Sequence, residues 1–314
     1  MSVVRGYRVY GQILALVAAA ICFPLPLYLV SLALFGVPHV VWEMGFIRQR
    51  YLKLAPTGWW LALGGVLLCD ASARLVYWLG LWSGEKTGII NMLALLLLAL
   101  LVVLVPSRIS LRARIAGLCL VGVVGGLLNA GEVALPLLLL GLIHNFSPLP
   151  MLWDMTRDTP SLKPLAWQMT GLFLIPLLLA CTALPGIALP EFMQGYVPLL
   201  DGQWPPSWAP AHRAGLWSAA VFAQCLHYFS VIYLLPKVQQ QQSGQAILPR
   251  WAKIVTLLAA LGLVGYYAVD YGTARKLYMV MAGIHAWLEW PVLLIALLGM
   301  QPPSARQRQD TAPA

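Results

Sequence analysis

Long apolar runs separated by short polar segments make up most of this sequence between residues 8 and 300. Several runs reach the roughly 20 residues that a helix needs to cross the hydrocarbon core of a bilayer. The fold that this pattern predicts is an all-α, polytopic integral membrane helix bundle. We predict clear membrane-spanning helices at residues 58–80, 88–105, 165–185, 212–235, 252–270 and 277–300.

Two further apolar segments, 8–47 and 114–146, are each too long for one upright helix and barely long enough for two. Each contains a plausible break, at the prolines of residues 24–26 and at the polar sequence "NAGE" of residues 129–132. If both segments are hairpins, the bundle has ten spans. Broken or re-entrant segments would leave eight or nine.

The basic residues favour ten spans with both termini in the cytoplasm. The chain carries 20 Lys and Arg against 11 Asp and Glu, a net charge of +9, and the basic residues lie in short loops. With both hairpins, nearly all basic clusters fall on one side, which the positive-inside rule identifies as cytoplasmic. Loop 186–211, which has no Lys or Arg, then faces outward. We therefore expect a protein of the bacterial inner membrane, and we interpret the charge as a topology signal rather than as a nucleic-acid site.

The composition agrees with this class and leaves little sequence for a soluble domain. Hydrophobic residues make up 60% of the chain, charged residues 10%, and the mean hydropathy is +0.78. We predict a single transmembrane domain over residues 1–300 and a disordered cytoplasmic tail over 301–314. The five cysteines are scattered through apolar runs, so neither a disulfide framework nor a thiolate metal site is expected.

Four histidines lie within the apolar runs, where ionisable side chains are expensive and usually functional. In the ten-span topology His39, His144, His227 and His285 belong to four helices that all run from outside to inside. The first three fall within one or two helical turns of one depth. Neutral imidazole suits iron, copper and zinc, so we predict that these histidines bind a metal ion. His212, in contrast, begins its span at the outer surface, where we expect it to be solvated.

Two of these histidines are followed by a carboxylate. His39 and Glu43, and likewise His285 and Glu289, are four residues apart, which places both members of each pair on one helix face. A carboxylate could bind the metal and compensate its charge, or orient a ligand histidine through the other ring nitrogen. The alternative is that each His and Glu is a hydrogen-bond partner between helices and carries no chemistry.

Aromatic side chains stand near the histidines in sequence. Tyr228 follows His227 directly and could donate a hydrogen bond to a bound oxygen species or anchor its helix at the interface. Trp42, Trp287 and Trp290 could line a cavity for an apolar substrate, although ordinary packing between helices explains them equally well.

Two other features concern different sites. Asp70 and Arg74 lie four residues apart on one span, and we expect an internal ion pair that lowers the cost of burying both charges. The chain has no phosphate-cradling glycine loop and no nucleophile elbow of the α/β-hydrolase kind.

Short stretches of the chain resemble a known family. The sequence "FGVPHVVWE" (35–43) is similar to the glycine-x-proline-histidine box of membrane β-carotene-cleaving dioxygenases, the Brp/Blh-like family. The sequence "LIHNFSPLPMLWD" (142–154) and the two late histidines resemble the other histidine-bearing helices of that family. The resemblance implies a membrane helix bundle that holds one non-haem iron on histidines and cleaves a carotenoid with dioxygen to give retinal. After His39 the chain has "VVWE" where the family usually has glycine and aspartate, and its late histidines lie on separate helices.

The leading hypothesis is a membrane non-haem iron oxygenase or oxidase. It would act with dioxygen on an apolar substrate such as a carotenoid, another isoprenoid or a lipid. One alternative is an electron-transfer protein in which histidine pairs hold haem. The other is a proton-coupled transporter that uses buried carboxylates. The candidate carboxylates for transport are Glu43, Asp70, Glu132 and Glu289.

Overall fold

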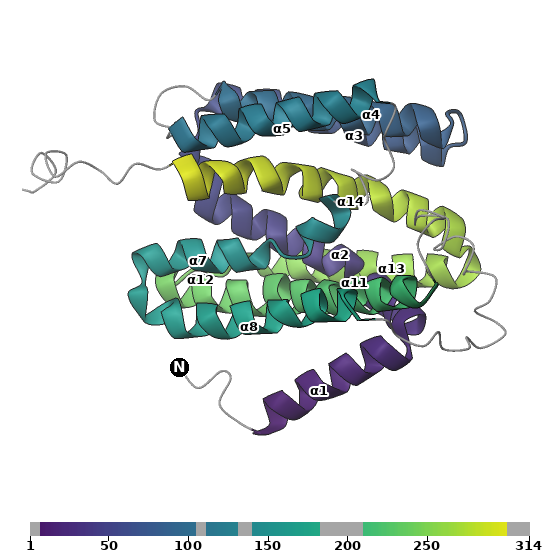
Figure 1. Cartoon of the computed structure of the whole chain (residues 1–314), viewed down its shortest axis with the longest axis vertical. Helices are drawn as coiled ribbons and strands as arrows, with labels where there is room; N and C mark the ends of the chain where they lie inside the picture. The colour runs from purple at the N-terminus through teal and green to yellow at the C-terminus, as the bar shows by residue number, and fades with distance from the viewer. Residues whose placement is uncertain (1–6, 105–110, 131–139, 183–209, 300–314) are drawn as a thin grey trace, which may run out of the picture. The chain divides into compact units, whose positions relative to one another are not determined.

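The computed structural model describes residues 7–104, 111–130, 140–182 and 210–299, which are almost entirely helical and contain no strand (Figure 1). The predicted all-α class is confirmed. The chain divides into two compact units, and both are discontinuous in sequence. The first unit comprises Met1–Glu43 and Leu138–Ala274, and the second comprises Met44–Leu137 and Arg275–Ala314.

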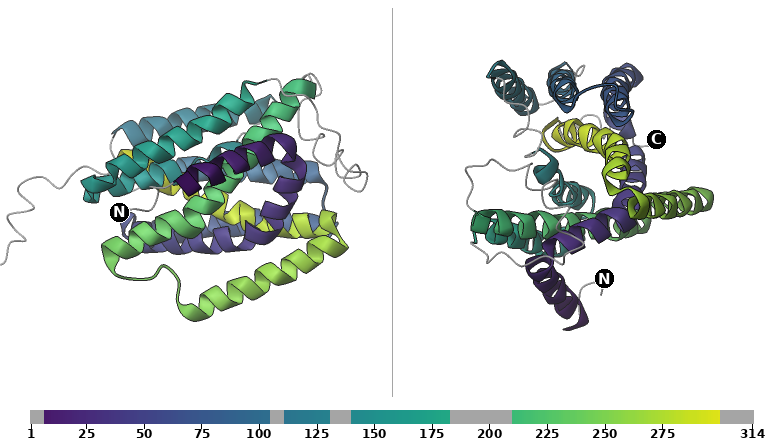
Figure 2. Two further views of the ribbon diagram at one scale, coloured as in Figure 1. Left: turned by 90° about the horizontal axis from the view of Figure 1, so that it is seen from below. Right: turned by 90° about the vertical axis from the view of Figure 1, so that its right-hand side faces the viewer.

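The first unit is built around helix α11. Both α8 and α1 pack against α11, and α7 packs against α8 (Figures 1 and 2). Figure 2 shows α13 standing apart from α8, and only 22% of its apolar window is buried, as suits a helix that faces lipid. The helices of this unit are α1 (Tyr7–Cys22), the first part of α2 (Pro24–Tyr51), α7 (Pro148–Asp158), η2 (Pro160–Leu162), α8 (Lys163–Ala180), α11 (Pro210–Phe229), η3 (Ser230–Leu234), α12 (Leu235–Ser243) and α13 (Arg250–Val269).

The second unit contains a row of three helices, in which α4 packs against both α3 and α5 (Figure 1). The segment η4 packs against α5. The helices of this unit are the end of α2, η1 (Leu52–Leu54), α3 (Thr57–Trp78), α4 (Gly84–Val103), α5 (Leu111–Asn129), nearly all of α14 (Tyr271–Leu294) and η4 (Ile295–Gly299).

Seven helical stretches of the described chain are long and apolar enough to cross a membrane. A helix of 20 residues, such as α4, is about 30 Å long, which matches the hydrocarbon core. These helices support the prediction that the chain is an integral membrane protein. The seven are Pro24–Tyr51, Thr57–Trp78, Gly84–Val103, Pro160–Ala180, Arg213–Ser243, Arg250–Val269 and Tyr271–Leu297, and two shorter apolar stretches are Gly11–Cys22 and Arg114–Leu127.

The predicted break in segment 8–47 is confirmed. Helix α1 ends at Cys22 and α2 begins at Pro24. Proline is tolerated in the first turn of a helix because its missing N–H has no partner there, and it disfavours helical geometry in the residue before it. In the second long segment α5 ends at Asn129, where the break was predicted. Glu132, most of the predicted outer loop (residues 186–209) and the predicted tail lie outside the described residues.

Two helical segments were not predicted. Residues 148–158 form the short helix α7, which is too short and too polar to register as a span. The span predicted at 212–235 continues to Ser243, because a π-helical segment, η3, connects α11 to α12 without a break. Glutamine is a good helix former, so the glutamines of α12 extend the helix.

A glycine allows α11 to lie close to α8. A Cβ atom at Gly215 would collide with the carbonyl oxygen of Thr182 and would lie 2.9 Å from that of Leu179. Both atoms belong to the backbone and cannot move aside as a flexible side chain would. Gly215 therefore fixes the approach of α11, the helix that carries His227, within the first unit.

Candidate metal centre

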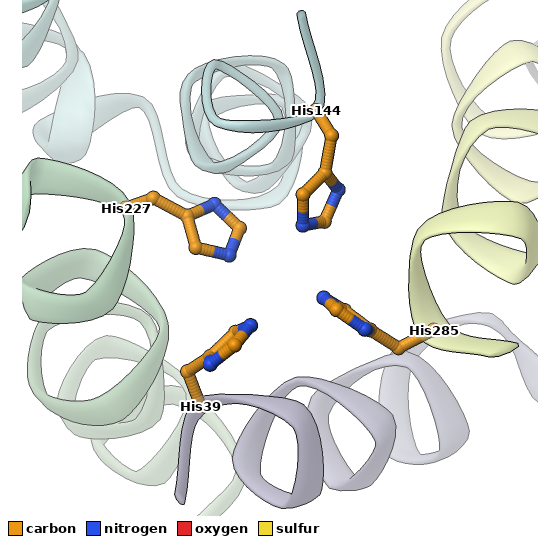
Figure 3. Close-up of side chains that lie close together, drawn as sticks. All are labelled: His39, His144, His227 and His285. Atoms are coloured by element: carbon orange, nitrogen blue, oxygen red, sulfur yellow. The ribbon is translucent and has the colours of Figure 1, made fainter. Parts of the chain in front are cut away.

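Three histidines from distant parts of the sequence meet in the first unit. His39 lies on α2, His227 lies on α11, and His144 ends a short helical stretch that precedes α7. One ring nitrogen from each lies within 4.8 Å of the others. The ring centroid of His227 is 5.3 Å from that of His39 and 4.6 Å from that of His144. Figure 3 shows these three rings turned toward one another.

Glu43 joins the three histidines. Its Oε2 atom lies 3.2 Å from Nε2 of His227, and both side chains are completely buried. A carboxylate oxygen of Glu43 also lies within 4.8 Å of a ring nitrogen of His144. A buried carboxylate is costly unless a positive charge or hydrogen-bond donors compensate it. We call His39, His144, His227 and Glu43 the metal centre, a buried cluster that could hold a metal ion.

The imidazole of His39 is held on two sides. Its Nδ1 atom lies 3.1 Å from the carbonyl oxygen of Phe35, one turn earlier on α2. Because a carbonyl only accepts hydrogen bonds, Nδ1 carries the proton and donates, which leaves the lone pair of Nε2 for a metal. The ring of Tyr228 lies against the same imidazole, with centroids 4.3 Å apart and planes at 32°. These contacts fix both the tautomer and the orientation of His39.

The helix that carries His227 widens directly after it. In the π segment Ser230–Leu234 the N–H of Leu235 donates to the carbonyl of Ser230, five residues earlier. Pro236 follows, and its ring would collide with the carbonyl four residues before it in a regular helix. An inserted residue relieves that collision. Single π turns are frequent at functional sites, and this one begins three residues after His227.

A tight turn ends the helix at His144. The backbone N–H of Ser147 donates to the carbonyl of His144 at 3.0 Å. The side-chain amide of Asn145 donates to the carbonyl of Gly141 at 3.2 Å, so it stabilises the helix end. Pro148 then begins α7. This turn places His144 at the end of a helix, where its ring reaches His227.

The donor set fits a first-row metal ion. Two ligand atoms that are each about 2.1 Å from a metal, at angles of about 90–110°, are about 3.0–3.4 Å apart. The 3.2 Å separation between Glu43 and His227 falls in this range. The same separation also suits a hydrogen bond from the imidazole N–H to the carboxylate, an arrangement common beside ligand histidines. Imidazole and carboxylate together suit iron, zinc or copper, so the donor types leave the metal open.

The other predicted pair lies in the second unit. His285 and Glu289 are both buried on α14, one helical turn apart. Between them Trp287 is also buried, and its indole ring lies 5.6 Å from the guanidinium carbon of Arg74. The described geometry of Trp287 is therefore that of a packing partner of α3.

Two of the tryptophans predicted to line a substrate cavity, Trp42 and Trp290, are half-buried. The predicted ion pair between Asp70 and Arg74 is confirmed, with 2.7 Å between Oδ2 and Nε.

The contact between Glu43 and His227 was not predicted, because the four-residue spacing pairs Glu43 with His39. In the structure the carboxylate instead lies beside a histidine of another helix. The sequence analysis did place His39 and His227 at a similar depth in the membrane, which was an indication that their helices could contact each other there. The spacing of residues along one helix, however, does not reveal which neighbouring helix a side chain contacts.

No protein-family model, curated protein or solved structure matches this chain. The resemblance to the Brp/Blh-like dioxygenases therefore stays a prediction from short motifs. The function has to be argued from the metal centre itself.

Proposed function

We propose that this chain is a membrane-embedded non-haem iron oxygenase or oxidase that acts with dioxygen on an apolar substrate. The observation that carries the proposal is the convergence of three histidines and Glu43, most of them fully buried, inside a bundle of apolar helices. Such a donor set is expensive to bury in a membrane without a compensating cation. A carotenoid or another isoprenoid is the substrate class that the sequence resemblance favours.

The number of converging donors argues against haem. A haem iron takes four ligands from the porphyrin and leaves two axial positions for the protein. In the metal centre, three histidine nitrogens lie within 4.8 Å of one another, and Glu43 is beside them. A porphyrin between two of these histidines would overlap the third. The arrangement therefore favours a metal bound by protein side chains alone.

The residues of the centre have distinct roles in this proposal. His39, His144 and His227 hold the metal, and Glu43 balances its charge as a ligand or through His227. Iron bound there would supply one-electron chemistry with dioxygen. The apolar helices exclude water, which protects reactive species and strengthens the electrostatic effect of nearby groups. The hydroxyl of Tyr228, whose ring lies against His39, is a hydrogen-bond donor for an oxygen species.

We assign His285 as a fourth ligand and Glu289 as its supporting carboxylate. Both side chains are buried on α14. Their spacing on α14 repeats that of His39 and Glu43 on α2. The half-buried Trp42 and Trp290 are candidates to line the path of the apolar substrate.

The metal proposal predicts the content and spectrum of the protein purified in detergent. Elemental analysis should find about one first-row metal ion per chain, since imidazole and carboxylate donors suit such metals. Iron is the metal that the resemblance to the non-haem iron dioxygenases favours. A reduced-minus-oxidised optical spectrum should lack the sharp bands of haem. Oxygen consumption should rise when β-carotene is added as the test substrate. A haem spectrum would establish the electron-transfer alternative, and the absence of tightly bound metal would favour a transporter.

The proposed orientation predicts where reporter domains will lie. A reporter inserted in loop 186–211 should be extracytoplasmic, and one inserted between α12 and α13, within residues 244–249, should be cytoplasmic. The reason is the contrast in charge, since the first loop has no Lys or Arg and the second is flanked by Lys237 and Arg250. Alkaline phosphatase and fluorescent-protein fusions report the two sides. Finding both loops on one side would rule out a hairpin over residues 165–235.

A further inference from the structure

The second unit contains a buried ion pair that the metal centre does not use. Asp70 is completely buried on α3, and Arg74, one turn later, is 9% exposed. Nε of Arg74 donates to Oδ2 of Asp70 at 2.7 Å. Among the described residues, Oδ1 of Asp70 has no hydrogen-bond partner, so this carboxylate is dedicated to Arg74. Buried charges in a membrane segment are costly, and such a pair needs a reason to be there.

The guanidinium of Arg74 lies directly against the backbone of α14. A Cβ atom at Gly283 would be 2.5 Å from Nε, 2.7 Å from Cζ and 3.0 Å from Cδ of Arg74. One turn later, the ring of Trp287 lies 5.6 Å from Cζ, a cation–π distance. Because Asp70 holds Nε, the arginine cannot retreat freely from a side chain at residue 283. A side chain at residue 283 would therefore have to displace Arg74 or α14.

A second contact shows how the two helices run. Nζ of Lys276 lies 5.0 Å from the ring centroid of Tyr77. The other contact between these helices joins Arg74 of α3 to Trp287 of α14. Going from the first contact to the second, the residue number decreases along α3, from 77 to 74, and increases along α14, from 276 to 287. The two helices are therefore antiparallel.

The residues on α14 that meet Arg74 lie opposite the proposed ligands. Gly283 and Trp287 are four residues apart and share a face. His285 and Glu289 follow them by two residues, which is a rotation of about 200° around the helix axis. Arg74 thus contacts the face of α14 formed by Gly283 and Trp287, while His285 and Glu289 lie on the opposite face.

We propose that the Asp70–Arg74 pair is a positioning device that sets the rotation of α14 and thereby the placement of His285 and Glu289. This inference rests on the proposed function, since it assumes that these two residues serve the metal. Side-chain ends lie about 5–6 Å from a helix axis, so a rotation of about 20° moves them by about 2 Å. Metal–ligand distances tolerate only about 0.2 Å, and therefore a small rotation of α14 weakens binding.

The test is Gly283→Ala in the full-length, detergent-purified protein, with Co²⁺ as the metal probe. The added methyl group displaces Arg74 or α14, so Co²⁺ affinity should fall on the order of 10–100-fold, as for other changes that support ligands indirectly. The ligand-field spectrum at saturating Co²⁺ should also change. Gly65→Ala is the matched control, because Gly65 lies on α3 and nothing lies within 4 Å of the position that its added methyl group would occupy. Equal affinities for the two variants would overturn the proposal.

A rescue experiment separates positioning from general damage. Arg74→Lys keeps the charge opposite Asp70 but removes the guanidinium with which the added methyl group collides, so in the Gly283→Ala background it should raise Co²⁺ affinity above that of Gly283→Ala alone and shift the spectrum toward that of the wild type. Failure of this rescue would contradict the proposal. If Gly283→Ala does not fold, Asp70→Asn takes its place in the test. It weakens the hold on Arg74 by removing the negative charge, and it adds no bulk. It should weaken Co²⁺ binding in the same direction, and wild-type affinity would overturn the proposal.

The same assay distinguishes this inference from the proposed function. His39→Ala removes a residue of the metal centre in the first unit and should lose Co²⁺ whatever the role of Arg74. If His39→Ala loses the metal while Gly283→Ala behaves like Gly65→Ala, the positioning role is wrong and the metal centre stands. If His39→Ala also keeps the metal, the proposed function itself is wrong.

Discussion

Replacing His227 with alanine is expected to lower metal affinity by more than about 100-fold, because even residues that only support a ligand contribute 10–100-fold. His227 is central to the metal centre: its ring contacts those of His39 and His144, and its Nε2 atom contacts Glu43. The alanine variant removes a donor and takes the His227 imidazole away from the buried carboxylate of Glu43. Metal content per chain and oxygen consumption, measured on protein purified in detergent, report the loss.

The other histidines that we propose as ligands extend this test. His39→Ala and His285→Ala should each strip the metal or abolish turnover, whereas His212→Ala, at the predicted outer end of its span, should do neither. Full metal content in the His39, His227 and His285 variants would reduce these residues to hydrogen-bond partners between helices. Retention in His285→Ala alone would confine the ligands to the first unit.

Most of the membrane-spanning helices could be predicted from the length of the apolar runs alone. Spans at 58–80 and 252–270 correspond closely to α3 and α13, because a run of about 20 apolar residues has one favourable structure in a bilayer. The break before Pro24 was predictable because proline acts locally. Helix α7 was not, because its 11 residues include two prolines in "PLP" and the charged "D", "R" and "D".

The metal centre was predictable in its residues but not in its contacts. Histidines are rare in membrane helices, so His39 and His227 could be selected from the sequence, and the depth estimate correctly grouped them with His144. The spacing rule that paired Glu43 with His39 uses only one helix. It cannot reveal that the carboxylate reaches His227, 184 positions further along the chain, since that depends on how α2 and α11 are rotated against each other.

The contact between Arg74 and Gly283 lies beyond sequence reasoning for the same reason. Asp70 and Arg74 were predicted as a pair because both stand on one helix. Gly283 is one of 27 glycines, and nothing in its neighbours distinguishes it. Its importance follows only from the distance between the guanidinium and the position that a Cβ atom at residue 283 would occupy.

The carboxylates give the last large expected effect. Glu43→Gln keeps the shape of the side chain, removes its charge and replaces one oxygen with a donor. If Glu43 only accepts a hydrogen bond from His227, the loss of charge should lower metal affinity or turnover on the order of 10–100-fold, and if it binds the metal the loss should be larger. The 3.2 Å contact fits both arrangements, so the size of the effect decides between them.

Glu289→Gln is the matched variant on α14, because Glu289 follows His285 as Glu43 follows His39. A loss of metal affinity in both variants would mean that carboxylates of both helices serve one metal ion. A loss only in Glu43→Gln would limit the charge compensation to the first unit. If both variants retain wild-type metal content and activity, the two carboxylates are structural, and the energetic cost of burying them must be offset by hydrogen bonds between helices rather than by a metal cation.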